Sequence, residues 1–158
     1  MKIELLSIFD GLFSVNTKEK KQEKSTAKIF MTDTHTNSGR TLMIEEETYA
    51  VWAYLLRADK EDIDFDGFLC AVIDPKFSGV NSHKNILERR DAPLPALYAN
   101  RYSYVKNLKK KDIKVHWQEE HVTISIKKKV YLIMDLNTKT SYSKGLADDC
   151  DYGKQLKS

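Results

Sequence analysis

An acidic run near the middle of the 158-residue chain has the spacing of half a calcium-binding loop. Asp62–Leu69 places aspartate at the first, third and fifth positions and glycine at the sixth, as an EF-hand loop does. The twelfth position should supply a bidentate glutamate, but it is Ile73. A bulged strand is the simpler prediction. In that strand the aspartates Asp62, Asp64 and Asp66 face water, and the apolar residues Ile63, Phe65 and Phe68 face inward.

Two further groups have the residue types of catalytic or metal sites. His116 and His121 flank a predicted turn, but the pair lacks the carboxylate or further ligand that a zinc site needs. Asp33, His35 and Ser38 match the residue types of a hydrolase triad, yet they are too close in sequence, on a turn, to adopt its geometry. No nucleophile elbow and no glycine-rich nucleotide motif occurs in the chain. We therefore expect no catalytic residue, no metal ion and no cofactor, and a protein that is not an enzyme.

The chain also carries two lysine clusters, Lys106–Lys111 and Lys127–Lys129. A nucleic-acid surface would need them joined into one stripe, preferably with exposed aromatic residues. Acidic residues nearby, Asp112 among them, dilute their field, and the formal net charge is only +3. We interpret the clusters as solvated turns whose lysines block edge pairing, with nucleic acid as the less favoured partner.

The elements that position these residues belong to one domain of ordinary size, with 41% apolar residues. The two cysteines, Cys70 and Cys150, do not suggest a disulfide framework. No apolar run approaches the ~18–20 residues of a membrane span, and the first residues lack the features of a signal peptide. We expect a cytoplasmic protein with reduced thiols and no membrane partner.

Three parts of the chain differ in pattern. Apolar residues at helical spacing predict a short helix over residues 1–15, docked on the core. Residues 16–26 are almost wholly polar and predict a tether. Residues 27–158 form a single β-rich domain.

Within this domain, Lys28–Thr32 and Thr41–Ile44 flank turn residues and predict a hairpin. Val51–Leu56 and Asp64–Ile73 are apolar on successive positions, which indicates that at least part of each strand is buried on both faces. Gly67 would permit a bulge or a close backbone approach.

Apolar and polar residues alternate in Ile113–Trp117 and again in His121–Lys127, and Val130–Leu136 follows after a lysine turn, which together predict a three-strand antiparallel meander. The fold class is mainly β (α+β): an antiparallel, strongly twisted sheet or half-barrel of about 6–7 strands with a short N-terminal helix. The predicted core comprises Trp52, Tyr54, Phe68, Leu69, Val115, Trp117, Val122, Ile124, Ile126, Leu132 and Met134.

The irregular stretch Pro75–Asn107 holds all three prolines, and Asn81–Arg90 within it could form a short helix. Long loops inside compact domains are often functional, and Ala92–Pro95 must be extended. Within this irregular stretch, the aromatic and arginine residues of the segment Ile86–Tyr104 suit a protein interface of ~800 Å² per side, although they could instead cover a sheet edge. The expected contact residues are Arg89, Arg90, Leu94, Leu97, Tyr98, Arg101, Tyr102 and Tyr104.

Several short motifs resemble a family of small uncharacterised bacterial proteins. They are Val51–Leu55, Asp91–Tyr98, Val115–Trp117, Val122–Ile126 and Thr140–Leu146, within a resemblance that spans about Ala27 to Gly153. The family often ends in a tryptophan-containing G-P-W-G-x-P-W element, whereas this chain has Asp151-Tyr152-Gly153.

The resemblance implies a non-enzymatic cytosolic protein, similar to immunity proteins that neutralise interbacterial toxins of the type VI secretion or Rhs kind. The expected partner is then a protein, with a toxin domain as the concrete case. A small nucleic-acid-binding or regulatory module, or a small enzyme that uses histidine and carboxylate groups, is the alternative.

Overall fold

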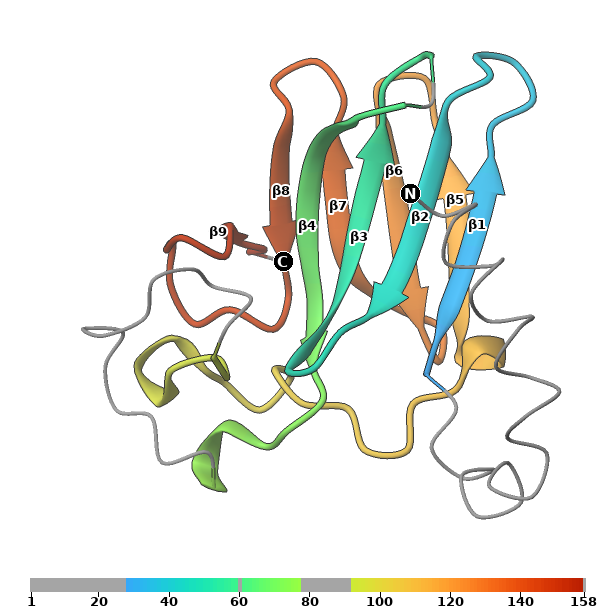
Figure 1. The fold of residues 1–158 in the computed structure, drawn as a ribbon. Coiled ribbons are helices and arrows are strands. Elements are labelled where there is room, and N and C mark those ends of the chain that lie inside the picture. Colours follow the sequence, from blue (N-terminus) through green and yellow to red (C-terminus); the bar gives the residue numbers. More distant parts are fainter. Residues whose placement is uncertain (1–27, 60, 78–91, 158) are drawn as a thin grey trace, which may run out of the picture.

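The computed structural model describes residues 28–59, 61–77 and 92–157, and its strands form two sheets packed face to face (Figure 1). The first sheet is antiparallel and has the order β1-β2-β3-β4. Its strands are β1 (Phe30–Thr34), β2 (Thr41–Glu46), β3 (Ala50–Leu56) and β4 (Ile63–Ala71). The predicted hairpin is therefore confirmed as β1 and β2.

The second sheet has the order β5-β6-β7-β8-β9. Its strands are β5 (Ile113–Trp117), β6 (His121–Ile126), β7 (Lys129–Asp135), β8 (Thr140–Ser143) and β9 (Lys154–Gln155). The predicted meander is confirmed as β5 to β7, and β9 alone pairs in parallel, with β8. Three short 3₁₀ helices complete the described elements: η2 (Pro75–Phe77), η3 (Ala96–Tyr98) and η4 (Lys110–Asp112).

The mainly β class is confirmed, whereas the single twisted sheet or half-barrel is replaced by two separate sheets with nine described strands. The reason is that β8 and β9 are too short to be predicted from the sequence pattern, and they extend the meander into a full second layer. The helix predicted over 1–15, the tether 16–26 and the short helix Asn81–Arg90 lie outside the described residues.

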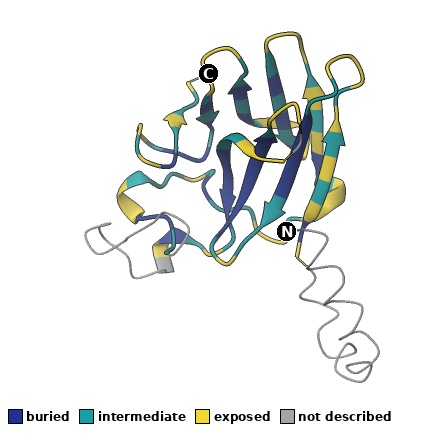
Figure 2. Cartoon of the chain, turned by 45° about the horizontal axis from the view of Figure 1, so that its top comes forward, coloured by how far each residue is buried: buried dark blue, intermediate teal, exposed yellow. Residues whose placement is uncertain are grey.

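The main core lies between the two sheets. Val51, Ala53 and Leu55 project from β3 toward Ile124 of β6 and Leu132 of β7, and all five side chains are fully buried. Alternation in β6 and β7 places their polar residues on the outer face of the second sheet. Figure 2 shows the result as dark central strands with exposed turns.

A second apolar cluster covers the outer face of the first sheet. Trp52 of β3 stacks on Tyr152 from the segment before β9, with ring centroids 5.7 Å apart, and Phe68 of β4 meets Tyr152 edge-on. Leu94 and Leu146 close this cluster, both almost fully buried. The prediction that at least part of each of β3 and β4 is buried on both faces is therefore confirmed, because late chain segments fold back over them.

Nine of the eleven predicted core residues are buried. Val115 and Trp117 are the exceptions and are only half-buried, since they lie on β5 at the edge of the second sheet. Gly67 faces Leu132 so closely that an added Cβ atom would lie 2.8 Å from a Leu132 methyl carbon. The expected close approach at Gly67 is thus real, and it lets β4 pack against β7.

Candidate functional site

The described part of the predicted contact segment, Ala92–Tyr104, crosses the lower end of the sandwich in Figure 1. Arg89 and Arg90 lie outside the described residues. The prediction that Leu94 is a contact residue is wrong, because Leu94 is only 2% exposed and belongs to the apolar cluster over the first sheet. The extended Ala92–Pro95 run turns this leucine inward, so its apolar character reflects the core.

The backbone of this segment is hydrogen-bonded to β4 and to the chain that follows β8. The Ala71 N–H of β4 donates to the Ser103 carbonyl at 2.6 Å, and the Ala147 N–H donates to the Tyr98 carbonyl at 2.8 Å. The Asn100 side chain donates to the Lys144 carbonyl at 3.0 Å and accepts from the Tyr102 N–H at 2.8 Å. The loop is therefore held in one conformation by hydrogen bonds to the sandwich.

Several side chains of the same segment remain at the surface. Leu97 is 63% exposed, Arg101 is exposed, and Tyr98 and Tyr104 are half-buried. Arg101 and Tyr104 line a depression of about 440 Å³ beside Lys76. These residues form a surface that combines an exposed apolar side chain, aromatic edges and positive charge.

Tyr102 lies at the centre of a group of cations. Its hydroxyl accepts a hydrogen bond from the Arg101 guanidinium at 2.8 Å, and the Lys144 and Lys129 ammonium groups lie 4.3 and 5.7 Å from its ring centroid. The Tyr131 ring meets Tyr102 edge-on at 6.2 Å. The Arg101 hydrogen bond, followed by the surrounding positive charge, lowers the pKa of Tyr102. Chemically, this arrangement attracts anions.

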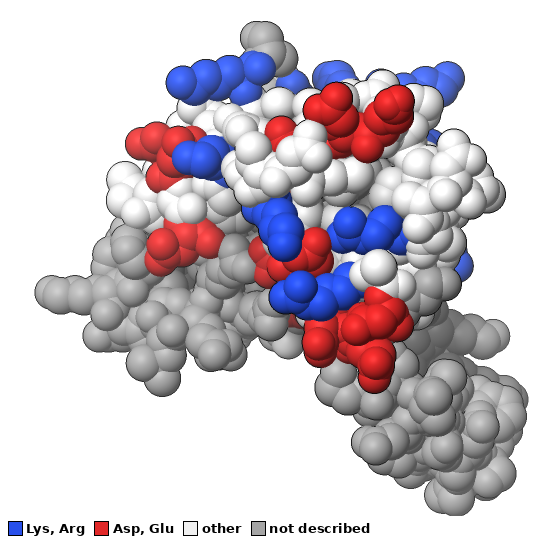
Figure 3. Space-filling view, turned by 90° about the horizontal axis from the view of Figure 1, so that it is seen from above, with Lys and Arg blue, Asp and Glu red and all other residues white. Residues whose placement is uncertain are grey.

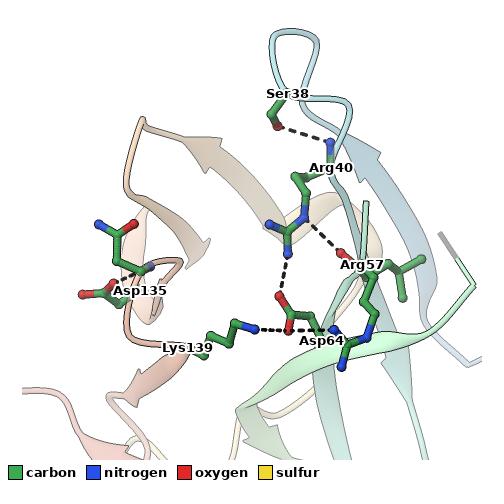
Figure 4. A network of polar contacts seen from close by, with 8 residues as sticks. Ser38, Arg40, Arg57, Asp64, Asp135 and Lys139 are labelled. Atoms are coloured by element: carbon green, nitrogen blue, oxygen red, sulfur yellow. Dashed lines mark hydrogen bonds and ion pairs between the residues drawn. The ribbon is translucent and has the colours of Figure 1, made fainter. Parts of the chain in front are cut away.

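A second polar cluster lies at the opposite end of the sandwich, around Asp64 (Figure 4). Its Oδ2 atom accepts a hydrogen bond from Arg40 at 2.9 Å, and its Oδ1 atom lies 3.0 Å from the Lys139 Nζ atom and 4.0 Å from Arg57 Nη1. Arg40 and Arg57 flank the first sheet, whereas Lys139 comes from the turn between β7 and β8. Asp64 therefore ties the two sheets together.

The prediction that Asp64 faces water and Ile63 faces inward is wrong. The Asp64 side chain is only 9% exposed and Ile63 is 43% exposed. The cause is a register shift, since Leu55 pairs with Phe65 and Leu56 with Ile63, which leaves Asp64 as an extra residue in β4. The sequence did predict a bulge in this strand, but it did not place the extra residue at Asp64.

Electrostatics hold Asp64 in its charged form. Burial acts to raise the pKa of this carboxyl, but the neighbouring Lys139 and Arg40 outweigh burial and lower the pKa overall. Seen from above, this end of the molecule mixes positive and negative side chains (Figure 3). The cluster therefore reads as an ion-pair network that closes one end of the sandwich.

The histidine-containing groups that the sequence offered as catalytic or metal sites make structural contacts. His35 stacks on Trp117 with centroids 5.1 Å apart and shares a 2.9 Å hydrogen bond with Ser38, while Asp33 accepts a hydrogen bond from the Trp117 indole. Across the described ranges, no group of three or more His, Cys, Asp or Glu residues is close enough to hold a metal ion. His121 lies opposite Asp135 in the β6–β7 pairing.

Comparison of the chain with family models, with curated proteins and with solved structures found no match. In the part of the chain that the structure describes, no helix has the length and apolar character to cross a membrane.

Proposed function

We propose that this protein is a non-enzymatic binding protein whose partner is another protein, docked on the segment Ala92–Tyr104. One contrast within this segment carries the proposal: its backbone is hydrogen-bonded to the sandwich while Leu97 and Arg101 project into solvent. A loop that is ordered before binding loses little conformational entropy when a partner docks. Such a loop is a ready interface.

The residue types at this surface support a protein partner. Arginine and tyrosine are enriched among the residues that dominate binding energy. Here Arg101 and Tyr104 line the depression, and the half-buried Tyr98 follows the exposed Leu97 in the chain. An apolar side chain that is 63% exposed has most of its surface available for burial. A partner that covers Leu97 would bury this apolar area and could insert a side chain beside Arg101.

The concrete version of the proposal is an immunity protein that neutralises a contact-delivered bacterial toxin, of the type VI secretion or Rhs kind. The resemblance to small bacterial proteins supports this version by analogy. In this version the partner is the toxin domain, and neutralisation needs only a stable complex that blocks the toxin.

The test is co-expression with the C-terminal domain of a large toxin-like protein encoded beside this one. We expect protection of the host cell and a complex that elutes as one species in size-exclusion chromatography. Leu97→Asp and Arg101→Glu should each weaken the complex about 30-fold or more, as substitutions at dominant interface residues do.

The matched control for Leu97→Asp is Ile63→Asp, which adds the same charge at an exposed apolar position on the opposite end of the molecule. Lys157→Glu serves the same purpose for Arg101→Glu, because Lys157 is also exposed. A neighbouring toxin domain that forms no complex, or one whose binding is unchanged in both folded surface variants, would contradict the proposal.

A further inference from the structure

The two lysine clusters of the sequence meet at the lower end of the sandwich. The β5–β6 pairing places Ile113 opposite Ile126, and the Lys127 N–H donates to the Asp112 carbonyl at 2.9 Å. The turn Lys127–Lys128 therefore adjoins η4 and the exposed residues Lys109–Lys111. A nucleic-acid surface requires the two lysine clusters to be joined, and this strand pairing brings them together.

The cation group around Tyr102 continues the same surface. Lys129 ends the β6–β7 turn and also lies 5.7 Å from the Tyr102 ring centroid, where Arg101 and Lys144 converge as well. We define the lysine end as the continuous set Arg101, Lys109–Lys111, Lys127–Lys129 and Lys144. These residues come from four separate segments, which the fold gathers at one end (Figure 1).

Most of the positive charge of the lysine end is left uncompensated by ion pairs within the described residues. None of its cations forms an ion pair with another residue of the described ranges. Asp112 lies within the set, where its carboxylate accepts the Lys109 N–H at 3.0 Å and caps η4, so its negative charge offsets only part of the positive charge. The opposite end differs, because there Arg40 and Lys139 are paired with Asp64.

The turn Lys127–Lys128 has a backbone that lysine does not favour. Both residues have positive φ, 50° and 72°, in a two-residue hairpin turn of the kind that prefers Asn-Gly. Lysine at these positions costs conformational energy that Asn-Gly would avoid. Residues held in such unfavourable conformations often belong to binding sites. Here the turn places two ammonium groups on the lysine end.

Lysine content decides between a protein and a nucleic acid as the ligand of this end. Lysine is depleted at protein interfaces, whereas flexible lysine ammonium groups are common contacts of nucleic-acid phosphates. The Tyr102 ring is already in contact with Arg101, Lys129 and Lys144, so it offers little free face for base stacking. Recognition would therefore use phosphates rather than bases.

We infer that the lysine end binds the phosphate backbone of nucleic acid without sequence preference. This site goes beyond the proposed protein interface. The two surfaces share Arg101, which also lines the depression beside Lys76, but Leu97 lies outside the lysine end and the lysines that carry the inference lie outside the proposed interface.

The test uses the full chain and two labelled probes, a single-stranded RNA of about 20 nucleotides and a DNA duplex of matching length, which exceed the site of one small domain. Fluorescence anisotropy between ~50 and ~200 mM salt gives affinity and its salt dependence. Lys127→Asn/Lys128→Gly removes two charges and supplies the preferred turn residues, so the thermal midpoint should rise. The salt slope for RNA should shrink by about 1.4, from ~0.7 for each lost contact.

The matched control is Lys154→Gln/Lys157→Gln, which lowers the net charge equally outside the lysine end and should leave the salt slope unchanged. No binding of either probe at ~50 mM salt would overturn the inference. Equal weakening of nucleic-acid binding by both double variants would also overturn the inference, because binding would then depend only on the net charge of the protein. Binding to phosphatidylserine vesicles with neither nucleic acid bound would assign the surface to membranes instead. Leu97→Asp should leave RNA binding unchanged, which separates this site from the protein interface.

Discussion

Removal of the Asp64 carboxylate should destabilise the fold by about 2–4 kcal/mol at pH 7. The charge-assisted hydrogen bond from Arg40, at 2.9 Å, is worth about 1.5–3 kcal/mol. Lys139 and Arg57 are more than half exposed, so each of their ion pairs adds only ~0–1 kcal/mol. A fully buried pair would cost ~3–5 kcal/mol when broken, but these two cations can hydrate once Asp64 is gone.

The assay is urea unfolding of Asp64→Ala, with Asp62→Ala as the control. Asp62 belongs to the same acidic run but is exposed, so its substitution should change the free energy of unfolding by less than about 0.5 kcal/mol. The thermal midpoint of Asp64→Ala should fall by about 5–15 °C, from ~2–4 °C for each kcal/mol. Equal stability of the two variants would refute the assignment of Asp64 as a tie between the sheets.

The pH dependence of the same variant is a second check. Burial raises the pKa of Asp64, but Lys139 and Arg40 lower it below its ordinary value in the folded protein. The stabilisation is therefore complete above the unfolded-state pKa of ~3.9 and disappears as the pH falls through the lower folded-state pKa. The stability gap between wild type and Asp64→Ala should narrow below about pH 4. A gap as large at pH 3 as at pH 7 would show that the effect comes from packing.

Three further predictions concern the core. Ile124→Ala should lower the free energy of unfolding by about 2–5 kcal/mol in a urea titration, because it leaves a cavity between the sheets; an unchanged midpoint would contradict the meander core. Gly67→Ala should also destabilise, since the new methyl group would lie 2.8 Å from a carbon of the buried Leu132, and Leu132→Ala should relieve part of that effect in a double variant. Cys70 should resist a thiol reagent until the protein unfolds, because it is fully buried and burial raises its pKa to about 12. Burial also raises the pKa of Cys150, but this thiol is only half-buried and should react in the folded state.

Much of the second sheet could be predicted because one of its faces is solvated. Along β6 every second residue is apolar, and this alternation fixes both the strand and its inward face. Bulges break the pattern, and there the prediction failed. Asp64 turns inward because β4 contains an extra residue, and no local rule of composition locates such an insertion.

The surfaces were predictable to different degrees. Leu97 and Arg101 are exposed as expected of contact residues, but Leu94 shares the same proline-rich stretch and is buried, because its environment depends on β3 and β4 far away in sequence. The joining of the lysine clusters was implicit in the sequence. Once Ile113 pairs with Ile126, Lys127 must lie opposite Asp112, so the hairpin register alone brings the two clusters together.

Burial of β3 on both faces has a consequence for amide hydrogen exchange. β3 has paired neighbours on both edges and apolar cover on both faces, whereas β6 is central in its sheet but solvated on one face. The amides of Val51, Ala53 and Leu55 should therefore exchange only through global unfolding. A ligand that binds only the folded chain raises the free energy of global unfolding, so it slows this exchange wherever on the molecule it docks. Exchange in this one strand would thus report a bound partner at either end of the molecule without a label.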